Sequence, residues 1–365
     1  MRFFCLALLF FSYTGFAQTP AVSPFIDTSN SRIRAATAFL QRYVENFRKS
    51  GETDFCKWFT PAQCRDYPIA DPIIHAISSD GNTYRMADLS TIFYARVSGN
   101  YVHLKTLFAW QNDAVLSPFA ITNHYVYSDA EGLRFHTETE HNATNYHTIV
   151  NGPVHYTFPA YLSFNKQRSD SLLAQMKAFE REWGFKPAKP FRYFFAQNAR
   201  ELAQMRGLDF GIGIDENTPS GYADEDSRII YCQGMGEAYF HEVLHLYLNP
   251  VYGRSPLNHG LIYFLAGGLG ETFPQQLTRL RKYLVLFPET DLSEYDKIVS
   301  KDRRLHINHI INGLLCSLAY RKEGVYGLER LLEYPNPEAL FRNEYGLERK
   351  DWDAFLRMKI RESAP

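Results

Sequence analysis

The nine residues FHEVLHLYL, positions 240 to 248, hold three ionisable side chains in an otherwise apolar run. His241 and His245 are four residues apart, so on a helix their imidazoles lie on one face, one turn apart. That spacing lets both rings bind one Zn²⁺ ion, while Glu242 is rotated aside and can reach a water molecule. A bound dication also offsets the cost of burying titratable groups that have no partners. The run therefore predicts a metal-binding helix in which Glu242 is the general base.

A catalytic zinc site needs a third protein ligand and one open position. Metzincins place a third histidine at the position that Val251 occupies here, and valine cannot bind a metal, so that class is excluded. Two candidates follow further along the chain, His259 and Glu271. We predict His259 as the third ligand and keep Glu271 as its competitor.

The first residues are typical of an export signal. Arg2 precedes the apolar run FFCLALLFF, and the exit segment that follows contains Gly15 and Ala17. The run is too short to span a membrane. We expect cleavage near Ala17 and an exported product, periplasmic or secreted, with no transmembrane segment in the mature chain.

The composition and net charge of the chain indicate which kinds of partner to expect. The chain is 45% hydrophobic and 22% charged, as globular proteins are, and its formal net charge is −1. It has no overall basic excess that would attract nucleic acid, so we expect no nucleic-acid partner.

The pattern of apolar residues divides the chain near residue 165. Residues 31–50 have the apolar spacing of a helix, and the segments after them alternate as strands do, at 91–97, 100–110, 121–128, 133–140, 146–151 and 154–162. Beyond 165 most segments are helical. We predict an α+β protein with a signal peptide at 1–17, an N-terminal α+β accessory domain at 18–165, and a mostly helical domain at 166–365 with a small sheet.

The second part resembles a known family. The run from GYADEDSRIIYC through FHEVLHLYL to NHGLIYFLAGGLGETF is similar to gluzincin-type metallopeptidases of the peptidase MA-like group. In that family an edge strand lines the substrate cleft and precedes the HExxH helix. A second helix then begins with a motif like Glu-Gly-Leu-Ala, whose glutamate is the third zinc ligand. Here His259 stands at that position, before Gly260 and Leu261. Imidazole also binds zinc, so a three-histidine site is chemically sound.

The resemblance covers roughly residues 170 to 360 and implies a zincin-like fold, a Zn²⁺ cofactor and a peptide or protein substrate. It implies hydrolysis of peptide bonds, with Glu242 as general base on zinc-bound water. We expect the strand at 227–231 to pair with an extended substrate. Candidates for stabilising the developing negative charge are Tyr222, Tyr231, His306 and His309. Because His259 replaces a glutamate, an alternative stays open: an inactive relative that binds peptides or cell-surface material.

Overall fold

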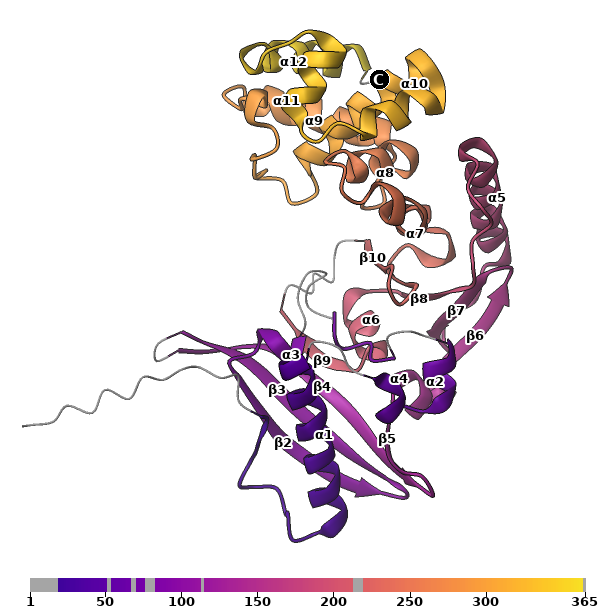
Figure 1. The fold of residues 1–365 in the computed structure, drawn as a ribbon, viewed down its shortest axis with the longest axis vertical. Helices are drawn as coiled ribbons and strands as arrows, with labels where there is room; N and C mark the ends of the chain where they lie inside the picture. Colours follow the sequence, from indigo (N-terminus) through magenta and orange to yellow (C-terminus); the bar gives the residue numbers. More distant parts are fainter. Residues whose placement is uncertain are drawn as a thin grey trace, which may run out of the picture. The chain divides into compact units, whose positions relative to one another are not determined.

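The computed structural model describes residues 19–50, 54–66, 70–75, 83–112, 115–212 and 219–363 (Figure 1). These residues form two compact units, one made of 19–141 with 203–212 and the other of 142–202 with 219–363. Each unit has its own mixed sheet, which confirms the α+β class. The predicted signal peptide, with its cleavage position at Ala17, lies outside the described residues.

The first unit packs one long helix against a sheet. The sheet runs in the order β1 (Ala21–Val22), β2 (Leu89–Ser98), β3 (Tyr101–Asn112), β4 (Val115–Asp129) and β5 (Gly132–His136), and β9 (Leu208–Gly211) also pairs with β4. Helix α1 (Ser31–Ser50) confirms the prediction for residues 31–50. The residues of β3 alternate, so that Val102, Leu104 and Phe108 are buried in the core that also contains Leu40 of α1.

Short helical turns complete the first unit. They are η1 (Phe55–Lys57), α2 (Pro61–Asp66), α3 (Thr83–Met86) and α4 (Glu138–His141). The prediction of one strand over 133–140 is wrong beyond His136, where the chain turns into α4. The carboxylate of Glu140 accepts the backbone N–H of Thr137 at 3.2 Å, a local bond that favours the helical turn over an extended strand.

The second unit contains a five-stranded sheet in the order β10 (Ser220–Asp224), β11 (Ile229–Gln233), β8 (Phe191–Ala196), β7 (Val154–Pro159) and β6 (Tyr146–Asn151). Strands β6 and β7 belong to this sheet because β7 pairs in parallel with β8. The boundary predicted at 165 therefore lies inside the second unit, while residues 203–212 return to the first unit through β9.

The remaining α-helices are α5 (Lys166–Trp183), α6 (Ala199–Met205), α7 (Phe240–Tyr252), α8 (Asn258–Ala266), α9 (Phe273–Leu286), α10 (Ile307–Leu332), α11 (Pro337–Leu340) and α12 (Trp352–Ser363). Shorter turns occur at Ala143–Asn145, Gly236–Ala238, Leu292–Glu294, Phe341–Tyr345 and Arg349–Asp351. Helix α7 runs on to Tyr252, with Pro250 inside its last turns. Among the described residues, no helix has the length and apolar character needed to cross a membrane.

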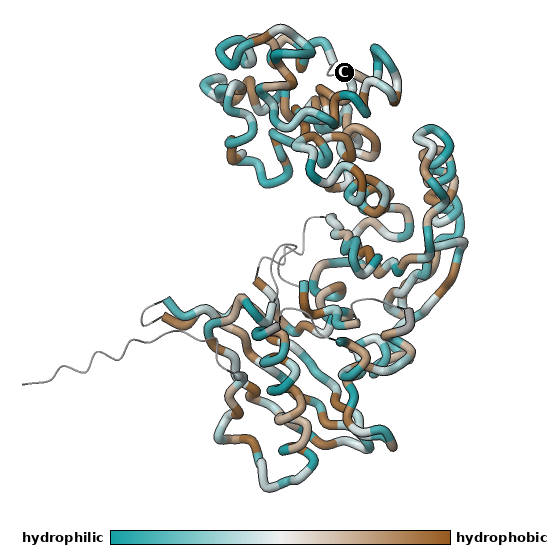
Figure 2. The backbone as a smooth tube through the Cα atoms, in the orientation of Figure 1, coloured by the Kyte–Doolittle hydropathy of each residue, from teal (hydrophilic) through white to brown (hydrophobic). Residues whose placement is uncertain are grey.

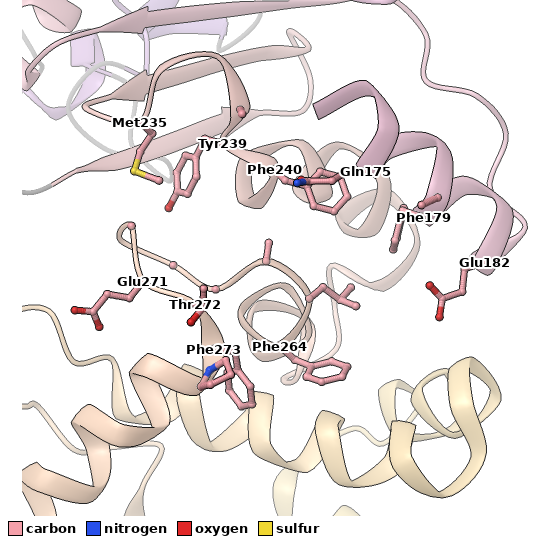
Figure 3. Close-up of a pocket in the computed structure, with 18 residues that line it drawn as sticks. Gln175, Phe179, Glu182, Met235, Tyr239, Phe240, Phe264, Glu271, Thr272 and Phe273 are labelled. Carbon is pink, nitrogen blue, oxygen red and sulfur yellow. The ribbon is translucent and has the colours of Figure 1, made fainter. Parts of the chain in front are cut away.

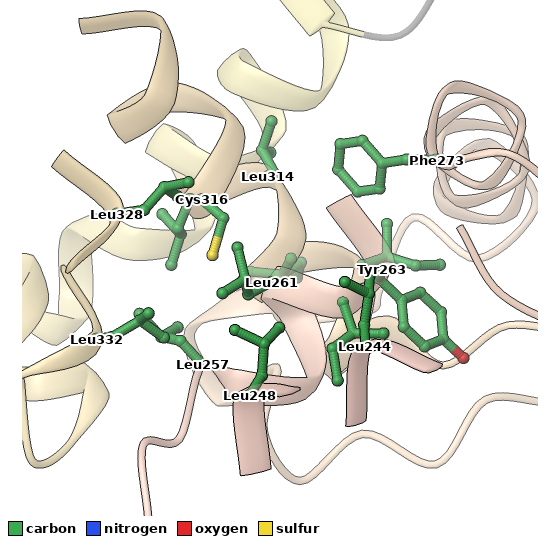
Figure 4. Packing of buried hydrophobic residues seen from close by; sticks show 14 of the residues in the cluster. Leu244, Leu248, Leu257, Leu261, Tyr263, Phe273, Leu314, Cys316, Leu328 and Leu332 are labelled. Carbon is green, nitrogen blue, oxygen red and sulfur yellow. The ribbon is translucent and has the colours of Figure 1, made fainter. Parts of the chain in front are cut away.

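The core of the second unit gathers around α7 and α8, where hydrophobic positions are concentrated (Figure 2). Leu248 of α7 and Leu261 of α8 pack together with Leu314 and Leu328 of α10 (Figure 4). All four side chains are fully buried. This packing holds three helices as one block, and the block positions the histidines described next.

Candidate functional site

Helix α7 carries its ionisable residues among buried apolar ones. Val243, Leu244 and Leu248 are fully buried. His241 and His245 are each only 6% exposed, and Glu242 is 4% exposed. The apolar positions thus anchor the helix, and the two histidines and the glutamate lie in the protein interior, as the spacing HEVLH predicts.

Each of the two helix histidines has a defined partner at Nδ1. His241 Nδ1 lies 2.5 Å from the carbonyl oxygen of Gly267, and His245 Nδ1 lies 3.2 Å from Oδ1 of Asn249. Both partners are acceptors, so Nδ1 carries the proton and Nε2 keeps a free lone pair. This is the arrangement found in histidines that bind metals, where a second group fixes the tautomer and the ring orientation.

Four imidazoles and one tyrosine form a closed ring of contacts. The ring centres of His241 and His245 are 5.3 Å apart, those of His245 and His259 4.8 Å, and those of His259 and His309 4.8 Å. Tyr263 closes the ring, at 5.1 Å from His309 and 5.3 Å from His241. Side chains from α7, α8 and α10 therefore meet at one place.

All of these histidines are uncharged at neutral pH. Burial lowers the pKa of His241 to about 4 and that of His245 to about 3, and neighbouring histidines add to both shifts. Burial likewise lowers the pKa of His309 to about 3, and it lowers the pKa values of His259 and His306. Neutral imidazoles are the form that binds metal ions.

Glu242 is held between α7 and strand β10. Burial raises the pKa of its carboxyl to about 8, nearby Glu225 adds to the rise, and a hydrogen bond from the backbone of Ala223 opposes it. Gly221 leaves the space that the side chain fills, because a Cβ atom there would lie 2.5 Å from Glu242 Cγ. A cation among the histidines would favour the ionised carboxylate.

The donor set fits a transition metal such as zinc by its chemistry. Two imidazoles that bind one zinc ion at about 2.0–2.1 Å have ring centres about 5 Å apart, close to the spacings observed here. Within the described ranges, however, no group of three or more His, Cys, Asp or Glu side chains is arranged to hold a metal ion as it stands. Binding therefore requires a third imidazole to turn toward His241 and His245, whose own rings are held by their Nδ1 bonds.

The two candidates for the third ligand are placed differently. His259 lies in the first turn of helix α8, with its ring beside that of His245. Glu271 is instead engaged by Arg279, whose Nε donates to Oε2 at 3.0 Å and whose Nη2 donates to Oε1. The structure thus brings His259, and not Glu271, next to the helix histidines.

The four candidates for stabilising the developing negative charge fall into two groups, only one of which lies in the histidine cluster. Tyr222 and Tyr231 face each other across β10 and β11, and Tyr231 stacks on Phe194 of β8. Because strand residues alternate, Tyr222 points to the face opposite that of Gly221 and Ala223, which lie near Glu242. His306 and His309, by contrast, lie in the histidine cluster, and His306 Nδ1 is 2.8 Å from the hydroxyl of Tyr263.

The strand expected to bind an extended substrate needs a correction. The prediction was the strand at 227–231, but β11 lies between β10 and β8 and has a neighbour on both sides. Among the described residues, strand β10 forms one edge of the sheet and lies next to Glu242. The two strands form a hairpin, and the sequence pattern did not reveal which of them is outermost.

Several residues of the site were not foreseen. Asn249, which orients His245, accepts a hydrogen bond from Asn258 at 2.6 Å and donates one to Glu225. The Gly267 carbonyl and the Tyr263 ring were also missed. No sequence signal pointed to these three residues. The sequence did indicate the part of the site at the start of α10, through the histidines at 306 and 309, three residues apart.

A groove of about 620 Å³ adjoins the site. Phe179, Tyr239 and Phe240 lie along one side of it, and Phe264 and Phe273 along the other (Figure 3). The ring of Tyr239 is nearly parallel to that of His241, with ring centres 5.5 Å apart, so the groove reaches the histidine cluster. Its volume is within the range of small-ligand sites.

Comparisons of the chain with protein-family models, with curated proteins and with solved structures find no match.

Proposed function

We propose that the chain is an exported zinc-dependent metallopeptidase whose second unit is a zincin-like catalytic domain that hydrolyses peptide bonds. The observation that carries the proposal is the placement of His241, Glu242 and His245 on one buried helix with His259 beside them. In this proposal the three histidines bind Zn²⁺, and Glu242 is the catalytic base.

A bound zinc ion would supply a Lewis acid that polarises a carbonyl oxygen and makes water more acidic. Glu242 takes the proton of the attacking water and delivers it to the leaving amine. Its position supports this role, because Gly221 leaves room for the Glu242 side chain between β10 and α7, on the same helix as the two histidines. The Nδ1 bonds of His241 and His245 fix the orientation of their rings, so that Nε2 of each is available to the ion.

The surroundings suggest how a peptide would lie. Strand β10 lies at one edge of the described sheet, beside Glu242, and an edge strand can pair with an extended peptide. The aromatic groove next to Tyr239 offers an apolar wall for a substrate side chain. Both features lie in the second unit, so the catalytic function is proposed for that unit.

The test is Glu242→Gln, which keeps the shape of the side chain and removes its basicity. We expect zinc content to stay at the wild-type level and cleavage of a peptide library, followed by mass spectrometry, to fall by about 100-fold or more. Glu333→Gln, at an exposed position of the second unit, is the matched control and should leave both properties unchanged.

Equal cleavage by Glu242→Gln and wild type would refute the proposal, as would retention of zinc by His241→Ala. Zinc binding by a wild-type protein that cleaves nothing would instead support the inactive, peptide-binding alternative.

A further inference from the structure

Helix α10 brings a fourth imidazole to the site, from a part of the chain that the HExxH pattern does not include. The ring of His309 lies 4.8 Å from that of His259 and 5.1 Å from that of Tyr263. His309 is therefore as close to His259 as His259 is to His245, at 4.8 Å.

This proximity is built into the packing of α8 against α10. Gly260 follows His259, and a Cβ atom at Gly260 would lie 2.2 Å from Cβ of Asn312. Asn312 is one helical turn beyond His309 on the same helix. It is itself fixed, because its amide donates to the carbonyl of Pro256 at 3.0 Å and accepts from the hydroxyl of Tyr295 at 2.9 Å.

The nitrogen atoms of His309 distinguish it from its neighbours. Its Nδ1 is buried and has no hydrogen-bond partner among the described residues. The Nδ1 atoms of His241, His245 and His306 each have one. A buried ring nitrogen without a partner is uncommon, and a cation bound in the cluster would satisfy it.

The rings of His259 and His309 are stacked, with an angle of 4° between their planes. A metal ion lies in the plane of each imidazole that binds it, since the nitrogen lone pair lies in that plane. Two rings stacked in parallel planes therefore cannot bind one ion together. His259 adjoins His245, and His309 adjoins His259, so either ring can complete the ligand set once its side chain turns toward His241 and His245.

We propose that His259 and His309 are interchangeable third ligands of the metal site, so that the ion is held by His241, His245 and one of the two stacked rings. The inference rests on the proposed metallopeptidase function, since it assigns a further ligand to the same site. An exchangeable ligand leaves one imidazole uncoordinated beside the ion, where it can contact the substrate.

The test is a double-mutant cycle on the full-length protein, with the zinc dissociation constant measured by competition with a chromophoric chelator. His259→Ala and His309→Ala are each expected to weaken binding by no more than about tenfold, because the other ring takes over. The double variant should lose zinc affinity by a factor far larger than the product of the two single-variant factors. The Co²⁺ absorption bands should persist in both single variants and disappear in the double variant.

His147→Ala is the control for the loss of a histidine, because His147 belongs to strand β6 and not to the cluster. This variant should bind zinc as wild type does. His309→Gln keeps a side chain of similar size, and circular dichroism of the metal-free variants checks that they fold. The inference is overturned if His309→Ala and His309→Gln bind zinc as tightly as wild type while His259→Ala matches the double variant.

The two proposals can fail separately. Retention of zinc by His241→Ala overturns both. If Glu242→Gln cleaves peptides as wild type does, the peptidase function is overturned. If the zinc affinities are non-additive in the same experiments, His259 and His309 are still alternative ligands.

Discussion

Single residues decide how Glu242, the proposed general base, is positioned. A Cβ atom at Gly221 would lie 2.5 Å from Glu242 Cγ and 2.9 Å from Tyr239 Cδ1, and both of those side chains are buried. Glycine therefore sets the distance between strand β10 and helix α7. The position of the Glu242 side chain thus depends on a residue that has no side chain of its own.

Gly221→Ala should displace Glu242 and lower kcat by about tenfold or more, with zinc affinity nearly unchanged, because His241 and His245 are not touched. Overpacking of this kind also lowers the free energy of unfolding by about 1–3 kcal/mol. Steady-state kinetics and a zinc titration measure the two effects. Ser220→Ala, the neighbouring substitution on β10, is the control, and wild-type kcat in Gly221→Ala would contradict the positioning role.

A second residue-scale effect concerns His124 in the first unit. This side chain is 5% exposed, and burial lowers its pKa to about 3 from the model-peptide value of 6.5. Its ring nitrogens lie 3.4 Å from the hydroxyls of Tyr84 and Thr122. The folded unit therefore holds His124 neutral at a pH at which the unfolded chain protonates it.

Between pH 6.5 and about 3 the unfolded state binds one more proton at His124, so the stability of the first unit should fall as the pH falls. The slope from this group is about 1.4 kcal/mol per pH unit. His124→Gln should remove that slope. The stability of the variant relative to wild type should therefore rise as the solution is acidified. Calorimetric unfolding from pH 7 to pH 4 measures this, with His147→Gln as the control; parallel curves for wild type and His124→Gln would contradict it.

At the scale of elements, close contact between α8 and α10 depends on two glycines. A Cβ atom at Gly260 would meet the backbone nitrogen of Gly313 at 2.8 Å, and one at Gly313 would meet the carbonyl oxygen of Gly260 at 3.0 Å. Backbone atoms cannot move aside as a flexible side chain can. The two helices thus approach closely at one turn, directly after His259.

Gly260→Ala should force the helices apart and destabilise the second unit by about 1–3 kcal/mol, although alanine alone favours a helix by about 1 kcal/mol. Zinc affinity should fall as well, because His259 and His309 move away from α7. Thermal unfolding and zinc titration test this against Lys322→Ala, an exposed position on α10. A variant with wild-type melting temperature would show that the contact is dispensable.

For the whole molecule, the chain passes between its two units more than once. Residues 142–165 carry β6 and β7, which pair with β8, and residues 203–212 carry β9 of the first unit. A fragment that begins at residue 166 should fail to unfold cooperatively, because β8 loses its partner β7. A fragment that begins at residue 142 should keep a cooperative transition. Circular dichroism melting compares the two, and cooperative melting of the shorter fragment would contradict the assignment of β7.

Zinc should stabilise only the second unit, because the histidine cluster lies there. Free zinc at 100 times its dissociation constant would add about 2.7 kcal/mol to the free energy of unfolding of that unit. Calorimetry with and without a chelator should show one transition that shifts and one that does not. A shift of both transitions, or of neither, would contradict this expectation.

The amphipathic helix at 31–50 and most of the strands were predictable, because they depend on the spacing of apolar residues along a continuous segment. The boundary at 165 could not be placed correctly, because the pairing of β7 with β8 joins segments on either side of helix α5. The edge strand was misplaced for the same reason. Strand order depends on contacts between distant segments, which the local pattern does not contain.

The sequence by itself determined the HExxH helix, because two histidines four residues apart on an amphipathic helix must share a face. It also pointed to His259 as a neighbour. Only the tertiary structure decided that His309 and Tyr263 close the cluster, that Glu271 is engaged by Arg279, and that Gly221 makes room for Glu242. These contacts arise from the packing of α7, α8, α10 and β10, and packing brings together residues whose spacing in the sequence carries no periodic signal.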